Sequence, residues 1–228
     1  MCGRYTLRRF DLLRQDFAAD YAPTFETFDE KRPRFNIAPS QHVPIVRLSS
    51  DGKRTLSAVR WGLIPSWTKG KPKQQPINAR AETIATSGMF RQAFARRRCL
   101  IPADGFYEWQ KVGGQKQPMF VRHADDRLFA FAGIWERWKP EEDAEPIDTM
   151  SIITTEPNSL MSPIHDRMPV ILSPQDYDAW LDRDAAGDAV SGLLKPYREH
   201  EMAAVAVSTR CNSPANDDCD CVAPLAVE

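Results

Sequence analysis

Short runs of β-forming residues, separated by residues typical of tight turns, recur along this chain and restrict it to a fold rich in antiparallel sheet. The clearest pair of runs spans 43–48 and 56–61 and flanks Asp51-Gly52. An Asp-Gly pair supplies the positive φ angles that a tight hairpin turn requires. The sequence therefore predicts a β-hairpin at this point of the chain.

Further β-like runs follow in the rest of the chain. They span 100–110, 118–123, 128–138, 148–155 and 202–208. The first three are separated by Gly113-Gly114 and Asp125-Asp126, which are turn residues. We therefore expect these three runs to form an antiparallel meander.

Helical patterns are fewer and shorter. Apolar residues at helical spacing predict an amphipathic helix over 10–21 and a helix in pieces over 81–95. Ser173 followed by Pro174 is typical of a helix start, with the serine as N-cap and the proline at the first position.

Two segments show neither pattern. The proline-bounded segment 33–39 predicts a shaped loop, and 62–78 predicts a mobile basic loop. Many short strands with a minority of helices predict one α+β domain over 1–228, with a core of about 2–222 and a C-terminal tail at 223–228. We expect its antiparallel sheets to curl into a barrel-like core with short peripheral helices.

Composition limits the environment and the partners. Of the 228 residues, 42% are hydrophobic and 27% charged, which is typical of a globular domain with an ample core. Lys and Arg number 30 against 31 Asp and Glu, so any contact with nucleic acid must rest on a local basic patch. The sequence has neither a secretory h-region nor a stretch of about 18 apolar residues, so we expect a cytoplasmic protein with no membrane partner.

The cysteines do not indicate a disulfide framework. Five is an odd and sparse number for this length, which fits a reducing compartment. Cys211, Cys219 and Cys221 lack the spacing of a zinc site, and no paired histidine lies nearby. We interpret these three as incidental and expect neither a metal nor another cofactor.

Cys2 is the first candidate for chemistry, because it follows Met1 directly. Its small side chain permits removal of Met1, which leaves an α-amine and a thiol on adjacent carbons. Their reference pKa values are about 7.7–8.0 and about 8.5, so part of the amine is nucleophilic near neutral pH. Such a terminus can form an imine with an aldehyde and close a thiazolidine through the thiol. The alternative is a cysteine at position 2 that has no function.

Three further residues have the chemistry of acids, bases or orienting groups. Glu108 lies among aromatic residues in a β-like run, where a pocket raises the pKa of a carboxyl group, although strand alternation can also turn it to solvent. His165 is a general acid or base, or a structural histidine. Asn78 orients a carbonyl or hydroxyl group, or caps a helix that begins near Arg80, where phosphate is favourably held.

Basic and aromatic residues interleave along the chain. They are Arg4, Arg80, Arg167, Arg96–Arg98 and the lysines of 69–73, with Trp61 and Trp67. Together they can form a groove that follows phosphates and stacks bases, and a solvated charged surface is the alternative.

Several of these stretches, taken together and in this order, resemble the SOS-response-associated peptidase family of abasic-site processing proteins. They are Met1-Cys2-Gly3-Arg4, Asn36-Ile-Ala-Pro39, Trp61-Gly62-Leu-Ile-Pro65, Asn78-Ala-Arg80-Ala-Glu82-Thr, Phe106-Tyr-Glu108-Trp109 and His165-Asp-Arg167-Met-Pro169. The similarity runs from residue 2 to about Val222. It implies an α+β domain, expected to be monomeric, that binds single-stranded DNA on the nucleoid during DNA damage.

The resemblance also implies roles for individual residues. Cys2 matches the nucleophile that captures an abasic site as a thiazolidine, and Asn78 the residue that orients it. Glu108 matches the acid or base for imine formation, strand cleavage and reversal, and His165 the group that helps open the sugar. The DNA-contacting positions implied are Arg4, Asn36, Trp67, Arg80, Thr154 and Arg167. Family members are also described as removing their own Met1.

Two other functions remain as alternatives at this point. An N-terminal-nucleophile glutamine amidotransferase also begins Met-Cys-Gly, but it needs glutamine-binding signatures such as Arg-Gly-Pro-Asp, which this sequence lacks. A non-enzymatic module for single-stranded DNA would use the arginine and tryptophan residues without Cys2.

Overall fold

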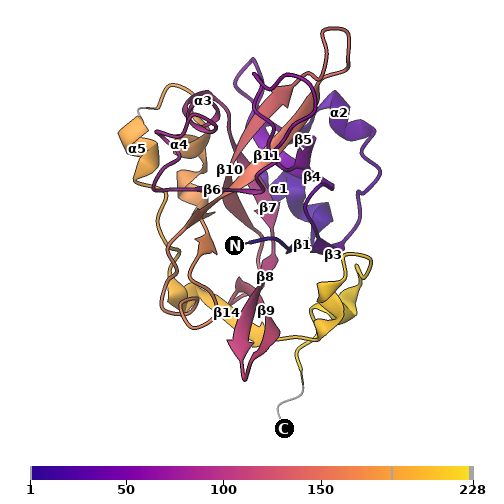
Figure 1. Cartoon of the computed structure of the whole chain (residues 1–228), viewed down its shortest axis with the longest axis vertical. Helices are drawn as coiled ribbons and strands as arrows, with labels where there is room; N and C mark the ends of the chain where they lie inside the picture. The colour runs from indigo at the N-terminus through magenta and orange to yellow at the C-terminus, as the bar shows by residue number, and fades with distance from the viewer. Residues whose placement is uncertain (1, 186, 226–228) are drawn as a thin grey trace.

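Five strands close into a barrel in the computed structural model of the chain, which describes residues 2–185 and 187–225 (Figure 1). They are β4 (His42–Leu48), β5 (Arg54–Trp61), β11 (Ile147–Thr155), β10 (Phe129–Trp138) and β7 (Arg98–Ala103). Neighbours in this order are paired, and β7 returns to β4 at Leu100 and Val46. All pairs are antiparallel except β5 with β11. The predicted barrel-like core of an α+β domain is therefore confirmed.

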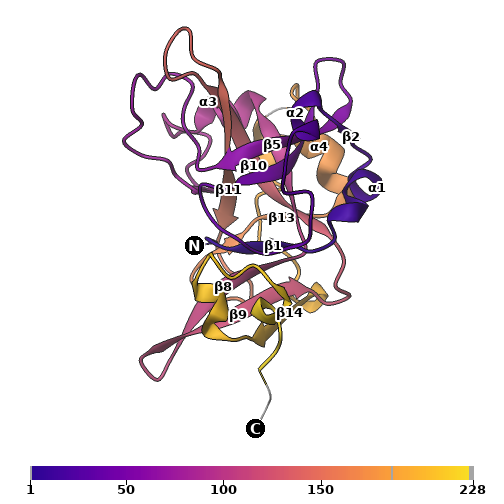
Figure 2. The same ribbon diagram turned by 90° about the vertical axis from the view of Figure 1, so that its right-hand side faces the viewer.

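A second sheet lies against the barrel. Its order is β14 (Met202–Ala206), β9 (Gln115–His123), β8 (Gly105–Val112), β1 (Tyr5–Leu7) and β3 (Arg34–Ile37). Figure 2 shows β1 passing between the barrel and the β8–β9 hairpin. Buried aromatic rings fill the junction, and the ring of Tyr5 lies 5.4 Å from that of Trp61 and 5.8 Å from that of Phe131. The start of the chain is thus part of the core.

The remaining elements are short and peripheral. The strands are β2 (Asp20–Tyr21), β6 (Asn78–Arg80), β12 (Met168–Pro169) and β13 (Ile171–Leu172). The α-helices are α1 (Leu13–Phe17), α2 (Pro23–Glu26), α3 (Arg91–Arg96), α4 (Tyr177–Leu181) and α5 (Gly187–Ser191). Short 3-10 turns span Phe10–Leu12, Pro174–Asp176, Glu199–Glu201, Thr209–Asn212 and Cys219–Cys221. None of the helices described is long and apolar enough to cross a membrane.

The predicted hairpin is confirmed, since β4 and β5 pair in register from His42 with Arg60 to Leu48 with Arg54. The predicted meander is wrong. The run 100–110 contains two strands, β7 in the barrel and β8 in the second sheet, which separate at Asp104. β10 pairs with β7, β11 and β13 within the described residues, so β8 and β9 form a hairpin without it.

Asp104 explains the separation. Its carboxylate is fully buried and accepts hydrogen bonds from the backbone N–H groups of Arg8 and Arg9 and from the hydroxyl of Thr6. Gly105 follows it, and a Cβ there would lie 2.3 Å from the ring of Phe120. The change of sheet therefore falls where a buried acceptor that binds the start of the chain is followed by a residue without a side chain.

The helices lie within the segments predicted for them, but they are shorter than predicted. The helix predicted over 10–21 ends at Phe17, because Ala18 adopts the left-handed conformation at φ 46° and closes the last turn. Of 81–95, only the end is α-helical, within Arg91–Arg96. The helix start at Pro174 is confirmed, although the Ser173 side chain makes no capping hydrogen bond to the described part of the chain.

Two loop or helix predictions are corrected by strand pairing. The segment 33–39 contains β3, which pairs with β1, rather than a loop throughout. Arg80 stands at the end of strand β6, parallel to β11, and not at a helix start. Of the predicted tail 223–228, residues 226–228 lie outside the described part of the chain.

Candidate active site

The start of the chain runs along the free edge of β8. The Tyr107 N–H donates to the carbonyl oxygen of Arg4 at 3.0 Å, the last backbone bond between these two segments among the described residues. Across from it, the side-chain amide of Asn78 donates to the carbonyl oxygen of Cys2 at 3.0 Å. β6, which carries Asn78, is fixed by its parallel pairing with β11. Two sheets therefore meet at Cys2.

The Cys2 side chain is buried. Burial raises the pKa of its thiol, and the nearby carboxylate of Glu108 raises it further. The thiol therefore stays protonated near neutral pH in this form of the chain. A group that removes or shares its proton must act before the sulfur attacks an electrophile.

Glu108 faces inward from β8 and is 2% exposed, which decides between the two interpretations of its orientation. Burial raises the pKa of its carboxyl group to about 7, and the negative charge of Asp166 acts in the same direction. Glu108 is therefore able to exchange a proton at neutral pH.

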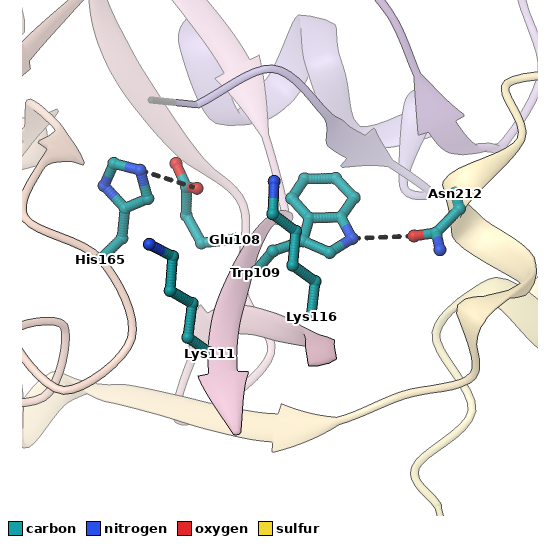
Figure 3. A pocket seen from close by; sticks show the side chains of 6 residues that line it. All are labelled: Glu108, Trp109, Lys111, Lys116, His165 and Asn212. Atoms are coloured by element: carbon teal, nitrogen blue, oxygen red, sulfur yellow. Dashed lines mark hydrogen bonds and ion pairs between the residues drawn. The ribbon is translucent and has the colours of Figure 1, made fainter. Parts of the chain in front are cut away.

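His165 lies beside Glu108, with its Nε2 3.9 Å from the Oε2 of Glu108 (Figure 3). The Nδ1 of the ring lies 3.0 Å from the backbone nitrogen of Arg167 and 2.9 Å from a carboxylate oxygen of Asp166, so the ring is held from that side and its Nε2 faces Glu108. Burial lowers the pKa of the ring, so it is largely neutral at pH 7. The pair thus combines a carboxyl group that holds a proton with a neutral imidazole.

Thr154 and Arg167 contact each other beside the loop that carries His165. The guanidinium group of Arg167 makes two bonds to the carboxylate of Glu82, at 2.6 and 3.0 Å, and donates to the carbonyl oxygen of Thr154 at 2.6 Å. Thr154 is fully buried on β11. In this arrangement Arg167 holds the His165 loop against β11.

Arg4 and Asn36 hold the C-terminal segment. Arg4 donates to Asn36 Oδ1 at 3.0 Å and to the carbonyl oxygens of Cys211 and Asn212 at 2.7 and 3.1 Å. The amide of Asn36 is fully buried and donates to carbonyl oxygens of the same segment. The Asn36 amide is therefore used inside the protein, and contact of Asn36 with DNA stays a prediction.

Arg80 and Trp67 are both exposed on the surface. Arg80 ends β6, two residues after Asn78. Trp67 is 58% exposed, and with Lys69, Lys71 and Lys73 it lines a cavity in the segment 62–78. Both side chains are therefore open to a ligand.

The arginine run 96–98 is only partly a charged surface. Arg97 pairs with the buried Glu136 at 2.6 Å. Arg98 is 5% exposed and donates to the carbonyl oxygens of Phe94 and Trp180, both at 2.7 Å, at the ends of two helices. Only Arg96 stays exposed, so the run cannot act as one phosphate-binding patch.

An open cleft of about 490 Å³ lies over the Glu108–His165 pair (Figure 3). It is lined by Glu108, Trp109, Lys111, Lys116, His165 and Asn212. Lys111 and Lys116 were missed by the sequence analysis, although the Gly113-Gly114 turn between them is a hairpin signal that sets them opposite each other. Within the described residues, no group of three or more His, Cys, Asp and Glu side chains is placed to hold a metal ion.

A buried thiol near the start of the chain, with a carboxyl–imidazole pair beside it, is the arrangement of a protein that uses a cysteine nucleophile with general acid–base help. The chain belongs to the SOS response associated peptidase (SRAP) family, whose model matches residues 1–214.

Its relatives carry consistent names. It is 43% identical over 222 residues to the abasic site processing protein YoqW of Bacillus subtilis, covering 95% of this chain and 96% of that one. It is 34% identical to the abasic site processing protein YedK of Escherichia coli, over 85% of each chain. A crystal structure of a protein from Bacteroides thetaiotaomicron matches with a TM-score of 0.89 at 27% identity, covering 99% of this chain and 100% of that one.

Proposed function

We propose that this protein processes abasic sites in DNA by capturing them covalently through Cys2, with single-stranded DNA as its substrate. The observation that carries the proposal is the position of Cys2, whose carbonyl is held by Asn78 while its thiol lies near Glu108. His165, 3.9 Å from Glu108, completes the acid–base pair. The family and the names of the relatives support abasic sites in DNA as the substrate.

Removal of Met1 is the first step, because an amine tied up in the Met1–Cys2 peptide bond is not nucleophilic. The freed α-amine of Cys2 attacks the C1′ aldehyde of the opened abasic sugar and forms an imine, and one water molecule leaves. The thiol then adds across the C=N bond, with sulfur going to carbon and the proton to nitrogen, to give a thiazolidine.

Glu108 and His165 carry out different proton transfers in this reaction. An abasic sugar exists mainly as a closed hemiacetal, so the ring must open before the amine can attack. His165 takes the proton of the hemiacetal hydroxyl group at Nε2 as the C1′–O4′ bond breaks, and it returns a proton to O4′. Protonated Glu108 donates to the water that leaves when the imine forms. The reverse transfers release the adduct. Loss of a C2′ proton from the imine instead expels the 3′ phosphate, which is the lyase reaction of such an intermediate.

The remaining residues bind the strand. Arg80 contacts a phosphate, and the exposed ring of Trp67 stacks on a base next to the lesion. Arg167 and Thr154 support His165, and Arg4 secures the C-terminal segment at the edge of the cleft.

A denaturing gel with an abasic single-stranded oligonucleotide tests the proposal. Wild type should give a heat-stable shifted band, and Cys2→Ser should not, because it lacks the thiol that closes the ring. Cys2→Ser keeps the α-amine, so borohydride should still trap its imine. A heat-stable band from Cys2→Ser, or competent wild type that retains Met1 by intact mass, would end the proposal.

A further inference from the structure

The β8–β9 hairpin extends past the point where β1 stops covering it. β1 pairs with β8 only at Gly105 and Phe106, and the last bond to that edge in the described part of the chain is made by the Tyr107 N–H. Beyond that residue, β8 continues along the cleft, which Glu108, Trp109 and Lys111 line. Lys111 on β8 and Lys116 on β9 stand directly opposite each other at the end of this hairpin.

Both lysines face the cleft that contains the acid–base pair. They line it together with Glu108 and His165, and Figure 3 shows both side chains rising from the hairpin on the side of that pair. Both are exposed. Among the described residues, neither ammonium group lies within 4.0 Å of a carboxylate.

The arginines near the cleft are already engaged. Arg167 is bound to both carboxylate oxygens of Glu82 and to the carbonyl of Thr154. Arg4 is bound to an amide oxygen and two carbonyl oxygens. A phosphate would have to replace these bonds, whereas Lys111 and Lys116 are able to bind one without losing any ion pair. Two like charges opposite each other also destabilise a bare hairpin, and an anion between them removes that repulsion.

We propose that Lys111 and Lys116 form a phosphate-binding pair that holds the phosphodiester next to the abasic sugar while its C1′ lies at Cys2. This inference rests on the proposed function, and it deepens it by naming the residues that set the register of the strand. Lysine suits the task, because its flexible stem and compact charge follow a phosphate that moves as the sugar opens. If the bound phosphate is the one on the 3′ side, the pair also stabilises its charge as it leaves.

Equilibrium binding separates this inference from the covalent chemistry. The probe is a fluorescent single strand with one tetrahydrofuran residue, an abasic analogue that has no aldehyde. Anisotropy titrations from low to moderate salt would compare wild type with Lys111→Gln, Lys116→Gln and the double variant. Affinity should fall, and the slope of log K against log salt should flatten by about 0.7 for each phosphate that the variant no longer neutralises.

Two control variants make the result specific. Lys53→Gln removes the same charge from the β4–β5 turn, where Lys53 pairs with Asp51, and should leave the slope unchanged. The double variant Lys111→Arg/Lys116→Arg keeps both charges and should keep the wild-type slope. A double glutamine variant with the wild-type slope overturns the inference, even if cross-linking through Cys2 is confirmed.

DNA strands with one uncharged backbone linkage show which phosphate the two lysines contact. A methylphosphonate is placed on the 5′ or the 3′ side of the tetrahydrofuran residue in separate strands. On one of these strands, wild type and the double glutamine variant should bind equally, because the charge that the lysines contact is gone. If the variant stays weaker by the same factor on both strands, the lysines do not contact either flanking phosphate.

Discussion

The side-chain amide of Asn78 donates a 3.0 Å hydrogen bond to the backbone carbonyl of Cys2 and so ties strand β6 to the start of the chain. The other polar atom of the same amide, Oδ1, is buried and has no hydrogen-bond partner among residues 2–185 and 187–225. A buried acceptor without a partner costs free energy, so this amide is oriented for Cys2 rather than for stability. Its oxygen is available to the amine or to a substrate hydroxyl group.

Replacing Asn78 with alanine should therefore slow cross-linking by about 10- to 100-fold, because the Cys2 backbone loses its orientation. Asn158→Ala is the matched control. It removes a buried amide that binds Tyr197 and Met161 and should lose about 1–3 kcal/mol of unfolding free energy, whereas Asn78→Ala gives up one hydrogen bond together with an unpartnered acceptor and should lose less. Urea denaturation and cross-linking rates would be measured on both. Equal slowing in the two variants would show that stability, not orientation, sets the rate.

The raised pKa of Glu108 makes stability depend on pH. Its carboxyl group titrates at about 7 in the folded chain, against about 4.5 when unfolded, so the folded state binds the extra proton between these values. Glu108 therefore favours folding below pH 4.5, and this contribution is lost as pH rises through 7. The unfolding free energy of Glu108→Gln relative to that of wild type should therefore rise by on the order of 3 kcal/mol between pH 4.5 and 8. Urea denaturation of both proteins across that pH range measures this rise. A difference in unfolding free energy that stays the same at every pH would contradict it.

The same variant should slow cross-link formation and reversal while leaving affinity for an undamaged strand nearly unchanged. Glutamine keeps the shape of Glu108 but cannot transfer a proton. The pH–rate profile should also lose its ionisation near 7. An equal loss of rate and affinity would reduce Glu108 to a structural role.

Local sequence patterns predicted the β4–β5 hairpin and pointed to the candidate residues. They did not predict how most of these side chains are oriented. Which face of β8 is buried, and so the inward orientation of Glu108, depends on its place in the sheet beside β1, a segment about 100 residues away. Asn78 and Arg80 were interpreted as a helix start because parallel pairing with β11 leaves no local signal. Pairing between distant segments decides these cases, and a single sequence does not record it.

Arg80 is exposed on the strand that positions Asn78, so Arg80→Ala should weaken binding to single-stranded DNA and flatten its salt dependence by about 0.7. Arg96→Ala is the control, since Arg96 is exposed as well but lies at the end of α3, where it faces Asp184 at 3.8 Å. Fluorescence anisotropy over a range of salt concentrations compares the two. The same slope for Arg80→Ala and wild type would argue against a phosphate contact.

Trp67 should contribute to binding without contributing to stability. At 58% exposure its ring adds little to the core, so Trp67→Ala should change unfolding free energy by less than about 0.5 kcal/mol. Loss of one stacked base should weaken binding to a single strand by about 1–3 kcal/mol. Trp67→Phe keeps an aromatic face and should recover part of the affinity. Unchanged affinity in Trp67→Ala would exclude stacking at this position.

Asp104 shows how one buried residue separates two sheets that the sequence joins in a single run. Its carboxylate accepts from two backbone N–H groups and pairs with Arg8 at 3.0 Å, while Arg8 also pairs with Asp126 at 2.6 Å. Asp104 is fully buried, whereas the Asp126 side chain is 36% exposed. The two carboxylates therefore allow a matched comparison on one arginine.

Asp104→Asn should cost about 3–5 kcal/mol of unfolding free energy, because it replaces one of the two acceptor oxygens with an NH2 group that faces buried donors, and it removes the buried charge that pairs with Arg8. Asp126→Asn removes an ion pair from the same Arg8 and should cost less than about 1 kcal/mol, since that pair is open to solvent. Urea denaturation of both variants would measure the difference. Equal losses would mean that Arg8 pairing alone, and not the bonds of Asp104 to the backbone of Arg8 and Arg9, holds β1 at the junction between the sheets.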